Sequence, residues 1–144
     1  MLDFPAPRVR VYPRETVVAE KLQAMVALGI VNSHMKDFYD LWMISREFTF
    51  DGELLAQAIA STFRYRRTEL PQTAPVALTA QFAQQPNKGR QWSAFLSRSG
   101  LAASNAELAH VIDDLGRFLM PVLSALAREE DFDVRWPAGG PWVS

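Results

Sequence analysis

The chain has 144 residues, of which 49% are hydrophobic and 22% charged, a composition typical of one globular domain with a sizeable core. Its formal net charge of -1 provides no general attraction to nucleic acid or to an anionic membrane, so such binding would need a local patch. The absence of cysteine excludes disulfides, thiolate zinc sites and cysteine nucleophiles.

The first 13 residues carry three prolines around an alternating segment, residues 8–12 (RVRVY). Alternation over so few residues predicts one short strand, which has no obvious partner in the rest of the sequence. The segment lacks the basic-then-apolar layout of a signal peptide. No apolar run approaches the roughly 20 residues of a membrane span. We therefore expect a cytoplasmic protein with no membrane partner.

Two helices are predicted next. The first covers residues 14–28 and ends at Gly29, a typical helix stop. The second begins at Asn32 or Ser33, either of which suits a helix cap, and runs to about residue 46. A short turn joins the two helices.

The first of these helices carries a lysine on its apolar side. Lys21 is spaced to lie in line with Val18 and Met25, where an apolar residue is expected. Its aliphatic stem could cover the core while the ammonium reaches water. The functional alternative is a lysine that binds the phosphates of a nucleotide.

The second helix carries two carboxylates on one side. Helical spacing places Asp37 and Asp40 on the same face as Leu41. Both lie in the first two turns, where carboxylates complement the helix dipole, and Asp40 can pair with Lys36 at i−4. Buried charges are costly unless they are paired or face a ligand, so the alternative is a functional site.

Further helices are predicted from Asp51 to a basic run at residues 64–67, then over residues 76–84, 89–98 and 105–128. Pro121 should kink or split the last of them near Leu119. The tail, residues 136–144, is too rich in proline and glycine for regular structure. The predicted fold is all-α: an irregular bundle of about six helices, residues 14–135, preceded by one short β-strand.

Several other polar residues have two interpretations. Arg64, Arg66 and Arg67 are either the cationic end of a helix or a patch that contacts RNA phosphates. Asp131 and Asp133 imitate a metal-binding Asp-x-Asp pair, but no Gly-Ser loop precedes them at the required distance, so we interpret them as a chance match. Two distant histidines without cysteine make a zinc site improbable, and we expect no metal to be held by this chain alone. The four tryptophans are expected to pack in the core and tail.

Three segments resemble the nucleotidyltransferase toxins of the AbiEii/AbiGii type. They are LDFPAPRVRVYPRETVVAEKL at residues 2–22, NSHMKDFYDL at residues 32–41 and, more loosely, FDGELLAQAIASTFRYRRTELP at residues 50–71. The resemblance covers about half of the chain, and the AEKL and KDFYDL motifs are its most specific parts. His34 stands where this motif would carry arginine.

The resemblance implies a type IV toxin of a toxin–antitoxin or phage-defence system, with a cognate antitoxin as its partner. Such a toxin transfers a nucleotide from an NTP with the help of Mg²⁺, in some members to tRNA. Lys21 would then hold the nucleotide phosphates, while Asp37 and Asp40 would serve the attacking hydroxyl or outer-shell metal contacts. The substrate-binding candidates are Lys36, Arg64, Arg66 and Arg67.

The resemblance also implies that part of the enzyme is missing. The family's catalytic sheet, with a Gly-Ser loop and a following Asp-x-Asp, lies upstream of the LDFP segment. Residues 1–13 would then be a lead-in from that upstream catalytic domain, and the chain would be the helical C-terminal portion, inactive alone. The alternative is a non-enzymatic helical module that binds RNA or protein.

Overall fold

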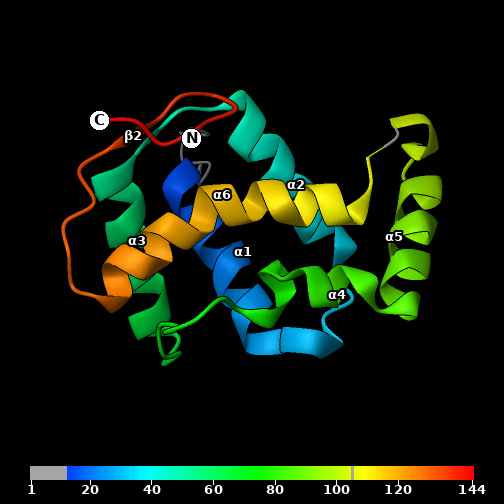
Figure 1. The fold of residues 1–144 in the computed structure, drawn as a ribbon, viewed down its shortest axis with the longest axis horizontal. Coiled ribbons are helices and arrows are strands. Elements are labelled where there is room, and N and C mark those ends of the chain that lie inside the picture. Colours follow the sequence, from blue (N-terminus) through cyan, green and yellow to red (C-terminus); the bar gives the residue numbers. More distant parts are fainter. Residues whose placement is uncertain (1–12, 105) are drawn as a thin grey trace, which may run out of the picture.

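The computed structural model describes residues 13–104 and 106–144, which form a helical bundle (Figure 1). The described residues form α1 (Arg14–Leu28), α2 (Met35–Glu47), α3 (Gly52–Tyr65), α4 (Ala80–Gln84), α5 (Pro86–Arg98) and α6 (Leu108–Ala127). Short 3-10 segments η2 (Gly29–Val31), η3 (Val76–Leu78) and η4 (Ala102–Ser104) lie between them. The predicted all-α bundle of about six helices is confirmed, whereas the strand predicted at residues 8–12 lies outside the described residues.

The boundaries of α1 and α3 follow from local signals in the sequence. The carbonyl of Pro13 accepts hydrogen bonds from the backbone N–H groups of Thr16 and Val17, and α1 ends at Gly29, whose φ is 58°. The side chain of Asp51 accepts hydrogen bonds from the backbone N–H groups of Glu53 and Leu54, in the first turn of α3, at 2.9 and 3.3 Å. Caps of this kind satisfy donors that have no partner within the helix.

The start of α2 differs from the prediction. The helix begins at Met35 with His34 at its N-cap. The prediction that Asn32 or Ser33 caps the helix is therefore wrong. Instead, the side-chain oxygen of Asn32 accepts a hydrogen bond from the His34 N–H at 2.7 Å. Asn32 therefore fixes the turn just before the helix, because its short polar side chain bonds the backbone two residues later.

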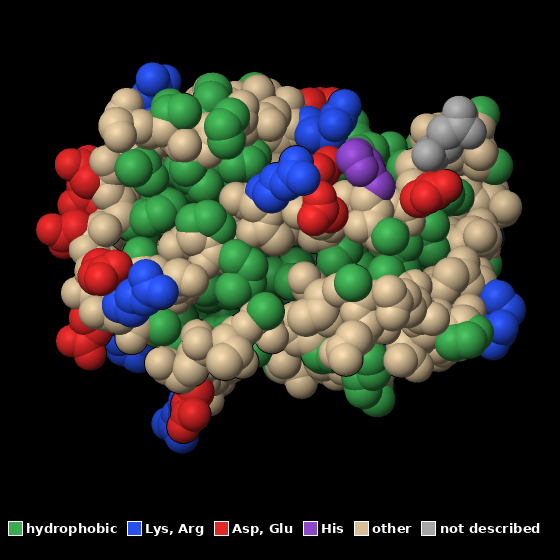
Figure 2. Space-filling model, viewed as in Figure 1, with side chains coloured by type: hydrophobic (Ala, Val, Ile, Leu, Met, Phe, Trp, Pro, Cys, Tyr) green, Lys and Arg blue, Asp and Glu red, His purple; other side chains and the backbone are tan. Residues whose placement is uncertain are grey.

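The face shown in Figure 2 carries both acidic and basic side chains, and a histidine lies beside some of them over α6. In the same orientation α6 runs across the front of the molecule (Figure 1). Pro121 lies inside this helix without splitting it. Within the part of the chain that the structure describes, no helix combines the length and the apolar character that a membrane crossing requires.

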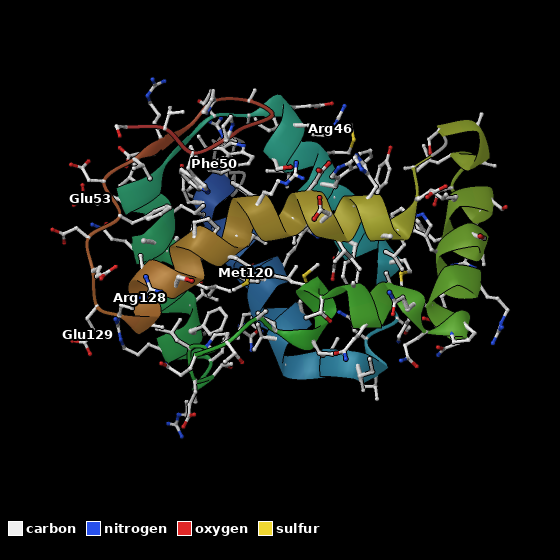
Figure 3. All side chains as sticks on the ribbon, in the orientation of Figure 1. Arg46, Phe50, Glu53, Met120, Arg128 and Glu129 are labelled. Atoms are coloured by element: carbon white, nitrogen blue, oxygen red, sulfur yellow. The ribbon has the colours of Figure 1, made fainter. Side chains whose placement is uncertain are left out.

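Residues 129–144 form a segment that we call the C-terminal strap. Figure 3 labels Arg128 and Glu129, where α6 ends and the strap begins. Strand β2 (Arg135–Trp136) of the strap pairs antiparallel with β1 (Phe50–Asp51). The Trp136 indole donates to the Ser45 carbonyl at 2.7 Å, and the Trp142 indole to the Phe118 carbonyl at 2.8 Å. The strap thus holds α2, α3 and α6 together, although most of it has no regular structure.

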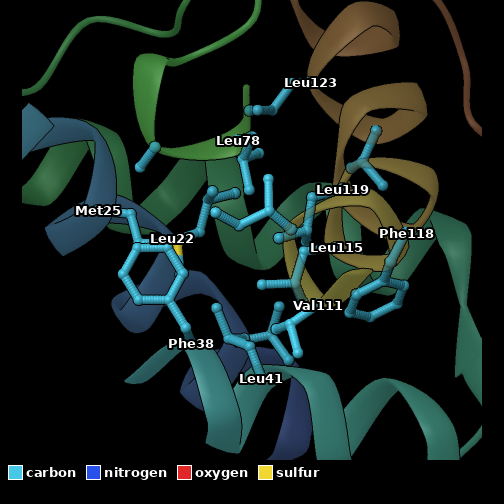
Figure 4. Packing of buried hydrophobic residues seen from close by; sticks show 14 of the residues in the cluster. Leu22, Met25, Phe38, Leu41, Leu78, Val111, Leu115, Phe118, Leu119 and Leu123 are labelled. Atoms are coloured by element: carbon cyan, nitrogen blue, oxygen red, sulfur yellow. The ribbon is translucent and has the colours of Figure 1, made fainter. Parts of the chain in front are cut away.

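The core lies where α6 packs on α2, α3, α4 and η3. Figure 4 shows Leu22 and Met25 of α1 among its buried side chains. Leu115, Phe118 and Leu119 of α6 are fully buried, as are Leu22 of α1 and Phe38 of α2. These apolar side chains recur at helical spacing, so each helix presents one continuous apolar face to the others. The core thereby fixes the polar side of α2 against α1.

Candidate functional site

The structure brings Lys21 of α1 together with Asp37 and Asp40 of α2. The Nζ atom of Lys21 donates a hydrogen bond to Oδ1 of Asp37 at 2.8 Å and lies 3.5 Å from Oδ2 of Asp40. The exposed fractions of the three side chains are 23%, 25% and 28%. The Lys21 ammonium therefore does not simply extend into water. It lies between two partly buried carboxylates. We call these three residues the Lys21 cluster.

Two further residues lie at the edge of the cluster. Lys36 Nζ donates to Oδ2 of Asp40 at 2.6 Å, which confirms the predicted i−4 pair. The exposed His34 ring has Nδ1 3.9 Å from Oδ2 of Asp37, too far for a hydrogen bond. Two lysines and two aspartates give these four charged side chains a net charge of zero. An incoming anion therefore meets no net repulsion from them.

The environment keeps Lys21 protonated. Burial by itself lowers the pKa of its ammonium, but the hydrogen bond and charge of Asp37, together with the charge of Asp40, outweigh burial and raise the pKa above 10.5. A lysine with a raised pKa is a permanent cation at neutral pH and a poor general base. Lys21 is thus suited to binding an anion.

The cluster keeps hydrogen-bonding capacity for a ligand. An ammonium has three donors, and Asp37 accepts only one hydrogen bond from Lys21. On the carboxylate side, the bonds among the described residues leave Oδ2 of Asp37 and Oδ1 of Asp40 available as acceptors. A molecule at the cluster could therefore accept a hydrogen bond from Lys21 and donate one to an aspartate.

A hollow of about 360 Å³ opens beside Asp37, between the N-terminus of α2 and α5. Lys36 and His34 line it from α2 and the turn before it, and Phe95 and Arg98 line it from α5. Its size lies within the range of small-molecule pockets. Sequence reasoning missed Phe95 and Arg98 as site residues, because no spacing along the chain relates α5 to α2.

The basic run at the end of α3 is not part of this arrangement. Arg64, Arg66 and Arg67 are all exposed. Among the described residues no ion pair joins them to the Lys21 cluster. The run is linked to α1 at another point, where Gln23 donates a side-chain hydrogen bond to Thr68 at 2.8 Å.

The described carboxylates do not form a metal site. In residues 13–104 and 106–144, no group of three or more histidine and acidic side chains is arranged to hold a metal ion. Asp131 and Asp133 lie with Glu53 around a hollow of only about 150 Å³. Asp37 and Asp40 are already engaged by ammonium groups. The described residues therefore do not fit a resident magnesium ion.

Comparison with known protein families identifies the relationship. The nucleotidyl transferase AbiEii toxin family, of type IV toxin–antitoxin systems, matches residues 1–125. The chain belongs to the AbiEii family. The matched range contains Lys21, Asp37 and Asp40, whereas the C-terminal strap lies beyond it, so this AbiEii member carries the strap outside the family match. No curated protein and no solved structure matched the chain.

Proposed function

We propose that this chain forms one wall of a nucleotidyltransferase active site, with Lys21 binding the phosphates of an NTP. The single observation that carries the proposal is the 2.8 Å contact between Lys21 and Asp37 within the matched AbiEii segment. An ammonium fixed in this way is oriented before the substrate arrives. The toxin activity would be transfer of a nucleotide to an acceptor hydroxyl.

Lys21 would act on the charge that develops at the phosphoryl group. Nucleotidyl transfer concentrates negative charge on phosphate oxygens in the transition state, and a preorganised cation stabilises it without costly reorganisation. Asp37 holds the ammonium in place, and at least one of its N–H donors remains for a phosphate oxygen. The raised pKa of Lys21 supports this role, because the charge persists at neutral pH.

Asp40 and Asp37 would also orient the attacking hydroxyl. Each has an oxygen that no described residue engages, and each is about a quarter exposed. A carboxylate oxygen can accept the hydroxyl proton or position the group for attack. The neighbouring hollow lined by Lys36 and Arg98 supports binding of the substrate on this side of α2.

The magnesium ions of the reaction would be held elsewhere. The described residues offer no group that fits a metal, and the 144-residue sequence contains no Gly-Ser loop. The proposed enzyme therefore needs an upstream catalytic segment that carries this loop and its Asp-x-Asp pair. Without that segment we expect the chain to be inactive.

The proposed acceptor is tRNA, and the proposed protein partner is a cognate antitoxin. The exposed arginines Arg64, Arg66 and Arg67 supply a local positive patch on a chain whose formal net charge is -1. Arginine contacts to RNA phosphates would make binding fall steeply with salt concentration. Membership of a toxin–antitoxin family supports the antitoxin as a partner.

The test is reconstitution. The 144-residue chain is incubated with each labelled NTP, magnesium and total tRNA, alone and then together with an AbiEii segment that carries the Gly-Ser loop and the Asp-x-Asp pair. We expect label in RNA only when both pieces are present, and loss of that label with Asp37→Asn. Label from the 144-residue chain alone, above a heat-killed control, would contradict the proposed division of the site.

A further inference from the structure

A second cavity, of about 440 Å³, lies between α2, α6 and the C-terminal strap. Its polar lining includes Arg46 of α2 and His110, Asp114 and Arg117 of α6. Trp136 and Pro141 of the strap form its apolar wall. We call it the strap cavity. Because its wall comes from the strap, it includes residues beyond the AbiEii match at residues 1–125.

Arg46 offers its guanidinium to this cavity. Figure 3 labels Arg46 near the end of α2, and the residue is exposed. The guanidinium carbon lies 4.8 Å from the centre of the Trp42 ring, and no carboxylate of the described residues lies within 4 Å of Arg46. A guanidinium stacked on an aromatic face keeps its N–H edge free for an anion.

The Arg117 guanidinium could also bind an anionic ligand in place of its present partner. The Nη2 atom of Arg117 lies 3.0 Å from Oδ2 of Asp113, one helical turn away. The exposed fraction is 71% for the Arg117 side chain and 62% for that of Asp113. An exposed pair at this spacing contributes little free energy. A ligand with a stronger negative charge can therefore compete with Asp113 for this guanidinium.

Asp114 is the negative group in the lining, and other residues engage it. Its Oδ2 atom accepts a hydrogen bond from the Trp42 indole at 2.8 Å and lies 3.3 Å from Nε2 of His110. The carboxylate thus orients the indole and the imidazole. The lining carries two permanent positive charges, Arg46 and Arg117, and this one negative charge. Asp113 is not part of the lining but pairs with Arg117, so the charge that an anion meets first is that of Arg46, which has no carboxylate partner among the described residues.

We propose that the strap cavity is a second ligand site, which binds a phosphoryl group between Arg46 and Arg117. A planar guanidinium can donate two parallel hydrogen bonds to the oxygens of a phosphate. Two guanidiniums that line one cavity therefore supply positive charge and also fix the orientation of the phosphate. The cavity is the size of a small-molecule pocket. Trp136 provides an apolar surface for the group that carries the phosphate. The site uses none of the residues of the Lys21 cluster, so it stands independently of the transfer reaction.

Two sources share this chemistry: a free mononucleotide, and the backbone of an RNA strand. Figure 2 shows basic, acidic and histidine side chains gathered over α6 on the viewed face of the molecule. The discriminating comparison is among inorganic phosphate, a nucleoside 5′-monophosphate and a single-stranded oligoribonucleotide. A preference for the oligonucleotide at equal phosphate concentration would assign RNA, and a preference for the monophosphate would assign the small molecule.

The experiment is a titration of the ¹⁵N-labelled chain followed by NMR at constant ionic strength. The indole N–H signals of Trp42 and Trp136 report on the cavity, and that of Trp92, which donates to the Ala106 carbonyl outside the cavity, serves as the internal reference. We expect phosphate compounds, but not chloride, to shift the two cavity signals. Arg46→Gln should weaken the affinity about tenfold or more, the loss of one bidentate charged contact. Because Arg46 is exposed, this variant should fold normally.

Arg90→Gln is the matched control, since it removes an exposed arginine of α5 outside the cavity. We expect its affinity to equal that of the unchanged chain. The proposal is overturned if no cavity signal shifts at about 50 mM phosphate, a concentration well above the dissociation constant of about 1 mM of a weak site. Equal weakening by Arg46→Gln and Arg90→Gln would overturn it as well, because general charge attraction would then explain the binding.

Discussion

The Nζ atom of Lys21 lies 2.8 Å from Oδ1 of Asp37, and this contact joins α1 to α2 across 16 residues of sequence. Asp40, 3.5 Å from the same ammonium, shares the charge. The pair lies at the junction of the AEKL and KDFYDL motifs, so the two most specific parts of the family resemblance meet at one point of the structure. Replacing Lys21 is therefore expected to change both the stability of the chain and the proposed transfer activity.

The structural consequence is a measurable coupling between the two helices. Lys21→Met removes the cation and leaves two partly buried carboxylates side by side, so we expect a loss of about 1–2 kcal/mol in the free energy of unfolding, between the values of exposed and buried pairs. Lys36→Met, which breaks a pair whose lysine is 74% exposed, should cost less than about 1 kcal/mol. Urea unfolding of Lys21→Met, of Asp37→Asn and of the double variant Lys21→Met/Asp37→Asn measures the coupling. Purely additive losses would show that the contact contributes no stability.

The raised pKa of Lys21 predicts a loss of stability at high pH. The unfolded chain binds this proton with a pKa near 10.5, and the folded chain binds it more tightly. The stabilising contribution is therefore complete below pH 10.5 and disappears as the pH rises through the folded pKa. Unfolding of the unchanged chain and of Lys21→Met should converge over this interval. A gap between the two that stays constant with pH would contradict the prediction.

Lys88 predicts the opposite pH dependence. Its side chain is 2% exposed, and Nζ donates to the Asn32 carbonyl at 2.6 Å without a carboxylate partner among the described residues. Burial lowers the pKa of Lys88 below 10.5. The unfolded chain then binds the proton more tightly, so stability should increase as the pH rises from the folded pKa towards 10.5. Relative to Lys88→Met, the unchanged chain should gain stability in that interval, and a relative loss would show that Lys88 has a compensating charge.

The contact between the strap and α3 predicts that a side chain at Gly52 lowers the stability of the chain. A Cβ atom at this position would lie 2.7 Å from the Val134 carbonyl oxygen and 2.8 Å from the Phe132 carbonyl oxygen. Gly52→Ala should therefore destabilise the chain by about 1–3 kcal/mol, because backbone must move to make room. Gly116→Ala is the control: nothing lies within 4 Å of its Cβ position in α6, and alanine there should add about 0.5–1 kcal/mol. Equal thermal stability of the two variants would show that the strap does not pack tightly on α3.

The first helix and its lysine could be predicted because their signals are local. Gly29 marks the end of α1, and helical spacing places Lys21 on the apolar side. The same spacing put Asp37 and Asp40 on one face of α2. Sequence alone left open whether Lys21 extends to water, since the answer depends on how closely α1 and α2 pack. The structure places its ammonium between the two carboxylates.

The strap and its cavity could not be predicted because their contacts are distant in sequence. Trp136 donates to the Ser45 carbonyl across 91 residues, and no spacing rule relates such positions. Proline and glycine predicted little regular structure at residues 136–144, but they carry no information about the indole hydrogen bonds of Trp136 and Trp142. Lys88 was missed for a similar reason, since its partner, the Asn32 carbonyl, lies 56 residues away.

The measurement that tests the account most directly is the initial rate of nucleotide transfer after reconstitution with an AbiEii segment that carries the Gly-Ser loop and the Asp-x-Asp pair. We expect Lys21→Met to leave thermal melting within a few degrees of the unchanged protein and to reduce transfer by about a hundredfold or more, the effect of losing one preorganised charge at the transition state. Lys21→Arg should restore only part of the rate, because a planar guanidinium does not replace a compact ammonium. Arg90→Met should transfer at the unchanged rate. Full transfer by Lys21→Met would contradict the assignment of Lys21 to the active site.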